Sequence, residues 1–155
     1  MKSNLLSLAK ETLQGVFHAH NWGQEFSEDL LDALVEEAKI NLNRKARFCL
    51  HPSPADSLQV TYLAFSRPYS DRIHNHPHTP QIVIPISGQA KFSTFNIEGK
   101  VLSSQILDGA SPVAVSLPTG VWHGFEVLSP SFIKLEAGTG PFLKDSTVFL
   151  QTPEE

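Results

Sequence analysis

The chain has 155 residues, of which 41% are hydrophobic and 18% charged, and its formal net charge is −4. This length fits one soluble globular domain with a single hydrophobic core, and the apolar fraction is too high for a disordered chain. The acidic balance provides no overall field that would gather phosphates, so we expect no nucleic-acid partner.

The single cysteine, Cys49, excludes an internal disulfide. No apolar run approaches the length that spans a bilayer, and Lys10 and Glu11 interrupt the leucine-rich start of the chain, which breaks the apolar stretch of a secretory signal. We therefore expect a cytoplasmic protein with no membrane partner. In such a protein Cys49 is expected to be a small buried hydrophobic residue rather than a nucleophile.

Residues 1–45 are expected to form an N-terminal helical extension. A helix over 28–40 is predicted because apolar residues recur at steps of three and four and line one face: Leu30, Leu31, Leu34, Val35 and Ala38. Ser27 is the expected N-cap, and Glu28 lies in the first turn, where the helix dipole favours negative charge. A thinner apolar pattern predicts a second short helix over 5–16.

After Ala46 the helical period gives way to short runs of β-forming residues separated by Gly, Pro, Asn and Asp. These runs predict strands at 58–65, 81–86, 89–95, 101–107, 113–117, 121–127 and 132–135. Roughly eight short strands in about one hundred residues are typical of a sandwich or barrel of jelly-roll type. We therefore expect an all-β barrel over residues 46–143, followed by a C-terminal tail over 144–155.

Three of the seven histidines fall within residues 74–78. Side chains two apart in a strand share a face, so His74 and His76 would present two imidazoles side by side. His123 shares a strand face with apolar residues, which points it into the barrel. Neutral imidazoles suit one divalent transition metal such as Zn, Ni, Fe or Mn. The competing interpretations are a core histidine satisfied by a hydrogen bond and a solvated histidine loop.

The spacing of these histidines resembles the two motifs of the cupin superfamily. The first motif corresponds to His74-x-His76 followed by Gln81 and Gly88, and the second to Pro118-x-Gly120-x-x-His123. The resemblance implies a single-domain cupin, a jelly-roll β-barrel, with a metal held by His74, His76, Gln81 and His123. Cupins carry many unrelated activities, so the resemblance implies a fold and a metal site but no particular reaction.

A narrower resemblance, to the WbuC-type cupin metalloproteins, covers the chain from about residue 26 to residue 142. It rests on Arg47-x-x-x-His51, Arg72-x-His74-x-His76, Trp122-His123 and Gly140-Pro141-Phe142. Proteins of this type are often associated with O-antigen polysaccharide genes, so the resemblance implies a small polar or sugar-like ligand. It also implies that Arg47 and His51 line the mouth of the site.

The sequence departs from the cupin pattern at Gln81, where Glu is usual. An amide oxygen brings a dipole instead of a negative charge, so the site would hold its metal less tightly. Three alternatives are open: Gln81 coordinates through its oxygen, His78 or Glu136 replaces it, or the metal is lost and the imidazoles act as acid and base groups. We expect coordination by three histidines with Gln81 as a weak or orienting ligand. Glu136 is out of phase with Ile133 and Leu135, so we expect it to face inward only if a bulge intervenes.

Residues near the mouth of the site are candidates for binding substrate: Arg72, His78, Arg47 and His51. Arg72 precedes His74 by two residues and would share its face, where it can neutralise an anionic substrate. Surface ion pairs and a solvated basic face are the competing interpretations for the two arginines.

The sequence thus predicts a cupin that binds one divalent transition metal and acts on or recognises a small polar or sugar-like molecule. As an enzyme, it would fit a metal-dependent isomerase or dioxygenase. Two alternatives are a metal-free epimerase or isomerase of the sugar-nucleotide kind and a non-catalytic ligand-binding or sensory cupin. Exposed apolar strands favour a homodimer.

Overall fold

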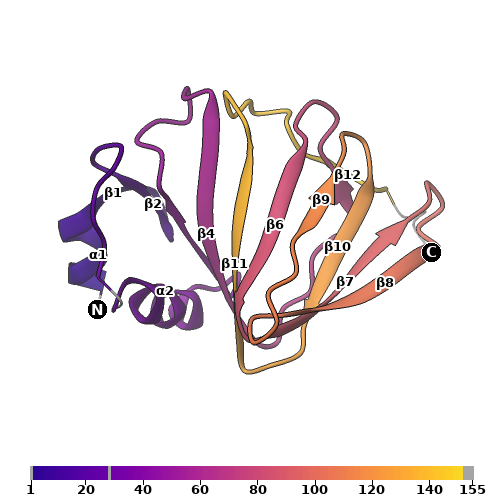
Figure 1. The fold of residues 1–155 in the computed structure, drawn as a ribbon, viewed down its shortest axis with the longest axis horizontal. Helices are drawn as coiled ribbons and strands as arrows, with labels where there is room; N and C mark the ends of the chain where they lie inside the picture. The colour runs from indigo at the N-terminus through magenta and orange to yellow at the C-terminus, as the bar shows by residue number, and fades with distance from the viewer. Residues whose placement is uncertain (1, 28, 152–155) are drawn as a thin grey trace.

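Two β-sheets face each other in the computed structural model, which describes residues 2–27 and 29–151, and both helices lie beside the larger sheet (Figure 1). The helices are α1 (Lys2–Leu8) and α2 (Asp29–Ile40). The strands are β1 (Ala9–Leu13), β2 (Val16–Ala19), β3 (Lys45–Cys49), β4 (Leu58–Ser66), β5 (His74–Asn75), β6 (Gln81–Ser87), β7 (Gln89–Phe95), β8 (Val101–Asp108), β9 (Val115–Leu117), β10 (Trp122–Val127), β11 (Ser131–Thr139) and β12 (Val148–Phe149). The all-β class predicted from the sequence is confirmed. None of the described helices has the length and apolar character needed to cross a membrane.

The chain moves back and forth between the sheets, as in a jelly roll. The seven-stranded sheet has the order β1-β2-β3-β4-β11-β6-β9, and the five-stranded sheet has the order β12-β5-β10-β7-β8. From β4 onward, successive strands or hairpins alternate between the two sheets. The sheets converge at the lower end of Figure 1 and diverge towards the upper end. This crossing pattern places segments that are distant in sequence on facing walls.

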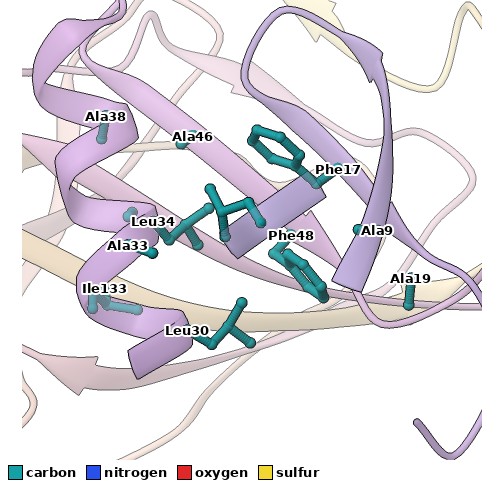
Figure 2. Close-up of a cluster of buried hydrophobic side chains, with 12 residues drawn as sticks. Ala9, Phe17, Ala19, Leu30, Ala33, Leu34, Ala38, Ala46, Phe48 and Ile133 are labelled. Atoms are coloured by element: carbon teal, nitrogen blue, oxygen red, sulfur yellow. The ribbon is translucent and has the colours of Figure 1, made fainter. Parts of the chain in front are cut away.

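Helix α2 covers the outer face of the seven-stranded sheet, against β3, β4 and β11 (Figure 1). Its buried residues Leu30, Leu34 and Ala38 meet Phe48 and Ile133 from the sheet (Figure 2). Burying a leucine side chain of this kind stabilises a fold by about 1.5–3 kcal/mol. The apolar face predicted from the period of the sequence is therefore the face that holds the helix on the sheet.

The helix predicted over 28–40 is confirmed as α2. The Leu30 N–H donates to the Ser27 carbonyl oxygen at 3.1 Å, so the helical hydrogen bonding begins at the expected N-cap. Glu28, which we expected in the first turn, lies outside the described residues.

The N-terminal extension is only partly helical. Helix α1 ends at Leu8, and the chain continues into the antiparallel pair β1 and β2, with Gly15 at a φ of 71° in the turn between them. The helix predicted over 5–16 is therefore wrong beyond Leu8. The left-handed conformation at Gly15 suits a tight turn, and pairing of β2 with β3 adds the hairpin to the large sheet.

Between the sheets lies a second hydrophobic core, centred on the aromatic side chains of Phe65, Phe92, Phe125 and Phe132. The rings of Phe65 and Phe125 meet edge to face, with centroids 4.8 Å apart. Both residues also border a cavity between the sheets, hereafter the inter-sheet cavity. The aromatic core thus forms an apolar wall beneath a polar site.

Candidate metal centre

Two strands of the smaller sheet bring three histidines together. His74 opens β5, His76 follows that strand, and His123 lies in β10, where it is the register partner of His74. The ring centroids of His74 and His123 are 4.4 Å apart, and that of His76 lies 5.1 and 5.4 Å from them. One nitrogen of each ring falls within 4.8 Å of the other two. We call this group the histidine triad.

Hydrogen bonds to backbone carbonyls fix the tautomer of every ring in the triad. The Nδ1 atom of His74 lies 2.8 Å from the Arg72 oxygen, and that of His123 lies 2.8 Å from the Val121 oxygen. The Nδ1 atom of His76 lies 3.0 Å from the Ser146 oxygen. A carbonyl oxygen only accepts, so each Nδ1 carries the proton and donates it. The lone pair of each neutral ring is therefore on Nε2.

Burial favours the neutral forms of His74 and His123. Burial lowers the pKa of His74, and burial together with the neighbouring His74 lowers the pKa of His123 to about 3. Tetrahedral zinc with Zn–N bonds of 2.0–2.1 Å needs nitrogens about 3.3 Å apart. The triad nitrogens lie within 4.8 Å of one another, so small rotations of the rings would bring them to that spacing. The donor chemistry and the spacing both fit a divalent transition metal.

Gln81 and Glu136 form a hydrogen-bonded chain with a buried lysine in the same cavity. The Gln81 Nε2 donates to Glu136 Oε1 at 3.0 Å, and Lys134 Nζ donates to Glu136 Oε2 at 2.8 Å. An ionised carboxylate only accepts, so the Gln81 amide must turn its NH₂ group towards Glu136. Its oxygen therefore points away from Glu136 and accepts no hydrogen bond from the residues that the structure describes, which is the orientation that a weak ligand requires.

The electrostatic balance at Glu136 favours the charged form. Burial alone would raise the pKa of this carboxyl, but the ammonium of Lys134 outweighs it, and the pKa falls to about 2. Glu136 is consequently ionised near neutral pH, and its negative charge balances the positive charge of Lys134.

The strand phase predicted for β11 is wrong. Ile133 packs beneath α2 on the outer side of the sheet, whereas Phe132, Lys134 and Glu136 face the space between the sheets. Because α2 covers the outer face, both faces of β11 are buried. An apolar residue in this strand can therefore lie on either face, and the positions of apolar residues do not show which face points between the sheets. Glu136 thus faces the cavity through ordinary strand alternation, and its role as a ligand replacing Gln81 stays untested.

Cationic side chains line the inter-sheet cavity, which has a volume of about 690 Å³: Lys45, Arg47, Arg72 and Lys134. This volume is typical of a small-molecule site. Burial and the nearby Arg47 lower the pKa of the Lys45 ammonium to about 8. Within the described part of the chain, the buried Nε of Arg47 has no hydrogen-bond partner. Lys45 and Arg47 thus offer positive charge and an unused donor to an anion.

The cavity gathers most of the residues singled out in the sequence: His74, His76, Gln81, Arg47, His51 and Arg72, with His123 completing the triad. The guanidinium of Arg72 lies 4.4 Å from the centroid of the Phe149 ring, so β12 helps to orient it. His78 is exposed and lies outside the cavity lining. The structure therefore separates His78 from the other candidates.

Sequence reasoning missed several residues that line the cavity. Lys45 and Lys134 were hidden because a lysine in a strand usually marks a solvent face. Cys49 is buried as expected, but its neighbours are His18 and His51. The spacing of Cys49 and His51, two residues apart, was an available signal because such residues share a strand face.

A family model described as a domain of unknown function (DUF6016) matches residues 26–107, which is more than half of the chain. No curated protein matches the sequence. The matched segment contains the first histidine pair and Gln81 and ends before His123.

Solved structures with the cupin fold resemble the chain. The capsular polysaccharide assembling protein CapF from Staphylococcus aureus has a TM-score of 0.60 at 15% identity, covering 73% of this chain and 31% of that chain. KdgF from Halomonas sp. has a TM-score of 0.52 at 19% identity, covering 64% of this chain and 82% of that chain. A structure described for the DMSP lyases RdDddP and RnDddQII has a TM-score of 0.56 at 20% identity, covering 86% of this chain and 63% of that chain. The chain spans about a third of the CapF chain. These likenesses establish the cupin fold predicted from the sequence.

Proposed function

This chain belongs to the family described as a domain of unknown function (DUF6016), and we propose that it binds one divalent transition metal in order to hold a small anionic, sugar-like molecule in the inter-sheet cavity. His74, His76 and His123 are the proposed ligands, with Gln81 as a weak or orienting ligand. The carrying observation is that all three Nδ1 atoms donate to backbone carbonyls, which leaves three Nε2 lone pairs for one ion.

The metal is proposed to be Zn, Ni, Fe or Mn, because imidazole nitrogens suit these ions. When bound, such an ion supplies Lewis acidity to an oxygen of the ligand. Glu136 turns the Gln81 amide so that its oxygen stays free, and Lys134 keeps Glu136 charged. These contacts favour Glu136 as a residue that orients Gln81 over Glu136 as a ligand.

The proposed ligand class follows from the charge of the cavity wall. Four cationic side chains line it, Lys45, Arg47, Arg72 and Lys134, against the two carboxylates of Asp71 and Glu136. An excess of cations favours a carboxylate or phosphate on the ligand. The name of one neighbour, a capsular polysaccharide assembling protein, supports a sugar derivative, as does the resemblance to WbuC-type cupins, whose membership we propose for this chain.

The metal content of the purified chain tests this proposal directly. After purification without chelator, or after reconstitution and desalting, we expect at least one ion per chain, with one ion held at the histidine triad. Elemental analysis by mass spectrometry gives the content and the identity of the metal. Less than about 0.1 equivalent of every transition metal, with no uptake on reconstitution, would remove the metal from the proposal.

Anion binding is expected to depend on Lys45. Glucuronate should raise the melting temperature of the metal-loaded chain, and neutral glucose should not. Lys45→Met should weaken glucuronate binding by about 10- to 100-fold, because a charge-assisted hydrogen bond contributes about 1.5–3 kcal/mol. Since the pKa of Lys45 is about 8, binding to the wild type should also decline as the pH rises through 8.

Calorimetric titration at several pH values measures this effect. The exposed Lys100 lies outside the cavity lining, so Lys100→Met is the matched control and should bind like the wild type. Equal binding of the acid and the neutral sugar would contradict an anionic ligand.

Three further expectations remain proposals. We propose a homodimer that uses the edge strand β8, because Val101, Leu102 and Ile106 are 52%, 67% and 53% exposed on it. We also propose a cytoplasmic location. The third is the division of the chain into an extension over 1–45, a barrel over 46–143 and a tail over 144–155.

A further inference from the structure

A second group of potential metal ligands lies on a different wall of the inter-sheet cavity. His18 is in β2, and Cys49 ends β3, where the two are register partners in the parallel pair. His51 follows Cys49 by two residues. All three side chains border the cavity, and the residues are 8%, 5% and 2% exposed. We call this group the His–Cys–His cluster; it shares no residue with the histidine triad.

The ligand atoms of the cluster converge. One nitrogen of each imidazole and the Sγ of Cys49 lie within 4.8 Å of one another. The two rings meet edge to face, with centroids 5.2 Å apart. Tetrahedral zinc needs N···N and N···S spacings of about 3.3–3.6 Å. Side-chain rotations that bring these ligand atoms closer together by up to about 1.5 Å would complete the site.

Backbone contacts position both rings of the cluster, and the contact of His18 leaves its Nε2 available for coordination. The Nδ1 of His18 lies 3.2 Å from the His51 carbonyl oxygen and donates to it, which leaves the lone pair on Nε2. The Val60 N–H donates to Nδ1 of His51 at 2.9 Å, and the Val60 carbonyl oxygen lies 3.0 Å from the same nitrogen. Accepting this N–H places the proton of the neutral His51 ring on Nε2, so coordination through Nε2 requires the ring to change to the tautomer in which Nδ1 donates to the Val60 oxygen. Burial lowers the pKa of His51, which keeps this ring neutral.

Cys49 is protonated in the absence of an ion. Burial raises the pKa of its thiol, against a smaller opposing effect of the Thr61 hydroxyl, whose oxygen lies 3.7 Å from the sulfur. A bound metal ion displaces the thiol proton and replaces it with a thiolate–metal bond. Such a bond also offsets the free-energy cost of burying three polar side chains at one point.

We propose that His18, Cys49 and His51 form a second metal site, separate from the histidine triad, that takes a borderline-soft divalent ion of the Zn²⁺ class. One thiolate and two imidazoles suit Zn²⁺ and Co²⁺, and they disfavour the hard ions Mg²⁺ and Ca²⁺. Three protein ligands on a cavity wall leave a fourth position that faces the cavity, which is the arrangement of a zinc site open to a ligand.

Anaerobic titration of the metal-free chain with Co²⁺ tests the second site. Cys49 is the sole cysteine, so a thiolate-to-cobalt charge-transfer band in the ultraviolet can arise from Cys49 alone. We expect this band in the wild type, two bound ions per chain, one for each group, and loss of the band when Zn²⁺ displaces cobalt. A wild type that loads the triad but shows no charge-transfer band would overturn the second site and leave the proposed function intact.

Variants separate the two sites. Cys49→Ser should abolish the band and remove one of the two bound ions, and His18→Asn should weaken the ion that gives the band by more than about 100-fold. The matched control is His20→Asn, since His20 is exposed and lies outside the cavity lining; it should leave the band unchanged. His123→Ala should remove the other ion and keep the band. An unchanged band and affinity in His18→Asn would exclude His18 as a ligand and overturn the three-ligand site.

Discussion

Replacing His123 with alanine should lower the metal content at the histidine triad from about one equivalent to less than about 0.1. His123 supplies one of three nitrogens within 4.8 Å of one another. Without it the ion keeps two imidazoles and the neutral amide oxygen of Gln81. Loss of an outer-shell partner alone costs about 10- to 100-fold in metal affinity, and loss of a ligand should cost more.

Elemental analysis and thermal unfolding with and without added Zn²⁺ measure the effect of His123→Ala. A ligand at 100 times its dissociation constant stabilises the native state by about 2.7 kcal/mol, and the variant should lose the share of this stabilisation due to the triad. The metal-free variant should still unfold cooperatively, because its two hydrophobic cores are intact. Measuring both proteins in a Cys49→Ser background removes any contribution of the His–Cys–His cluster.

His78→Ala is the matched control, since it removes an exposed imidazole two residues from His76. It should retain the metal content of the wild type. The assignment of ligands would be wrong if His78→Ala lost the ion while His123→Ala retained it.

The members of the histidine triad could be proposed from the sequence because a local pattern marks each of them. The pair His74 and His76 follows from strand alternation, and His123 was marked as facing inward by its apolar neighbours. The all-β class was predictable for the same reason, since each strand carries its own pattern of burial and its own turns. The meeting of β5 and β10 needed the fold, or a resemblance to a known family.

The remaining cavity residues were hidden because non-local pairing creates their surroundings. His18 meets Cys49 only after β2 pairs in parallel with β3, thirty or so residues away in the chain. Glu136 was expected to face inward only with a bulge, because Ile133 on the other face of β11 is apolar where α2 buries it. A strand face that a helix covers is apolar, as is the face towards the core. The alternation of residues therefore does not show which of the two faces points into the cavity.

Replacing Lys134 with methionine should destabilise the metal-free protein by about 3–5 kcal/mol at pH 7, the usual cost of removing one partner from a buried ion pair. The Lys134 and Glu136 side chains are 10% and 23% exposed, and Lys134 Nζ lies 2.8 Å from Glu136 Oε2. The ammonium also lies 4.7 Å from the centroid of the Phe125 ring. Methionine preserves the apolar stem against this ring and removes only the charge.

The pH dependence separates this charge effect from lost packing. In the wild type, the pKa of Glu136 is lowered from 4.5 to about 2, so its contribution to stability is fully present above pH 4.5 and is lost as the pH falls towards 2. Without Lys134, burial should raise this pKa above its ordinary value. Acidification from pH 7 should then stabilise the variant relative to the wild type, and urea unfolding of both proteins at several pH values between about 7 and 4 measures the difference.

A double variant tests whether Glu136 is the source of that instability. Adding Glu136→Gln to Lys134→Met removes the unpaired carboxylate and leaves an amide beside Gln81. Replacing both members of a buried ion pair is often neutral, so the double variant should recover to within about 1 kcal/mol of the wild type. If the double variant stayed as unstable as Lys134→Met, the lost packing of the lysine stem would explain the effect, and the electrostatic role of Glu136 beside Gln81 would be wrong.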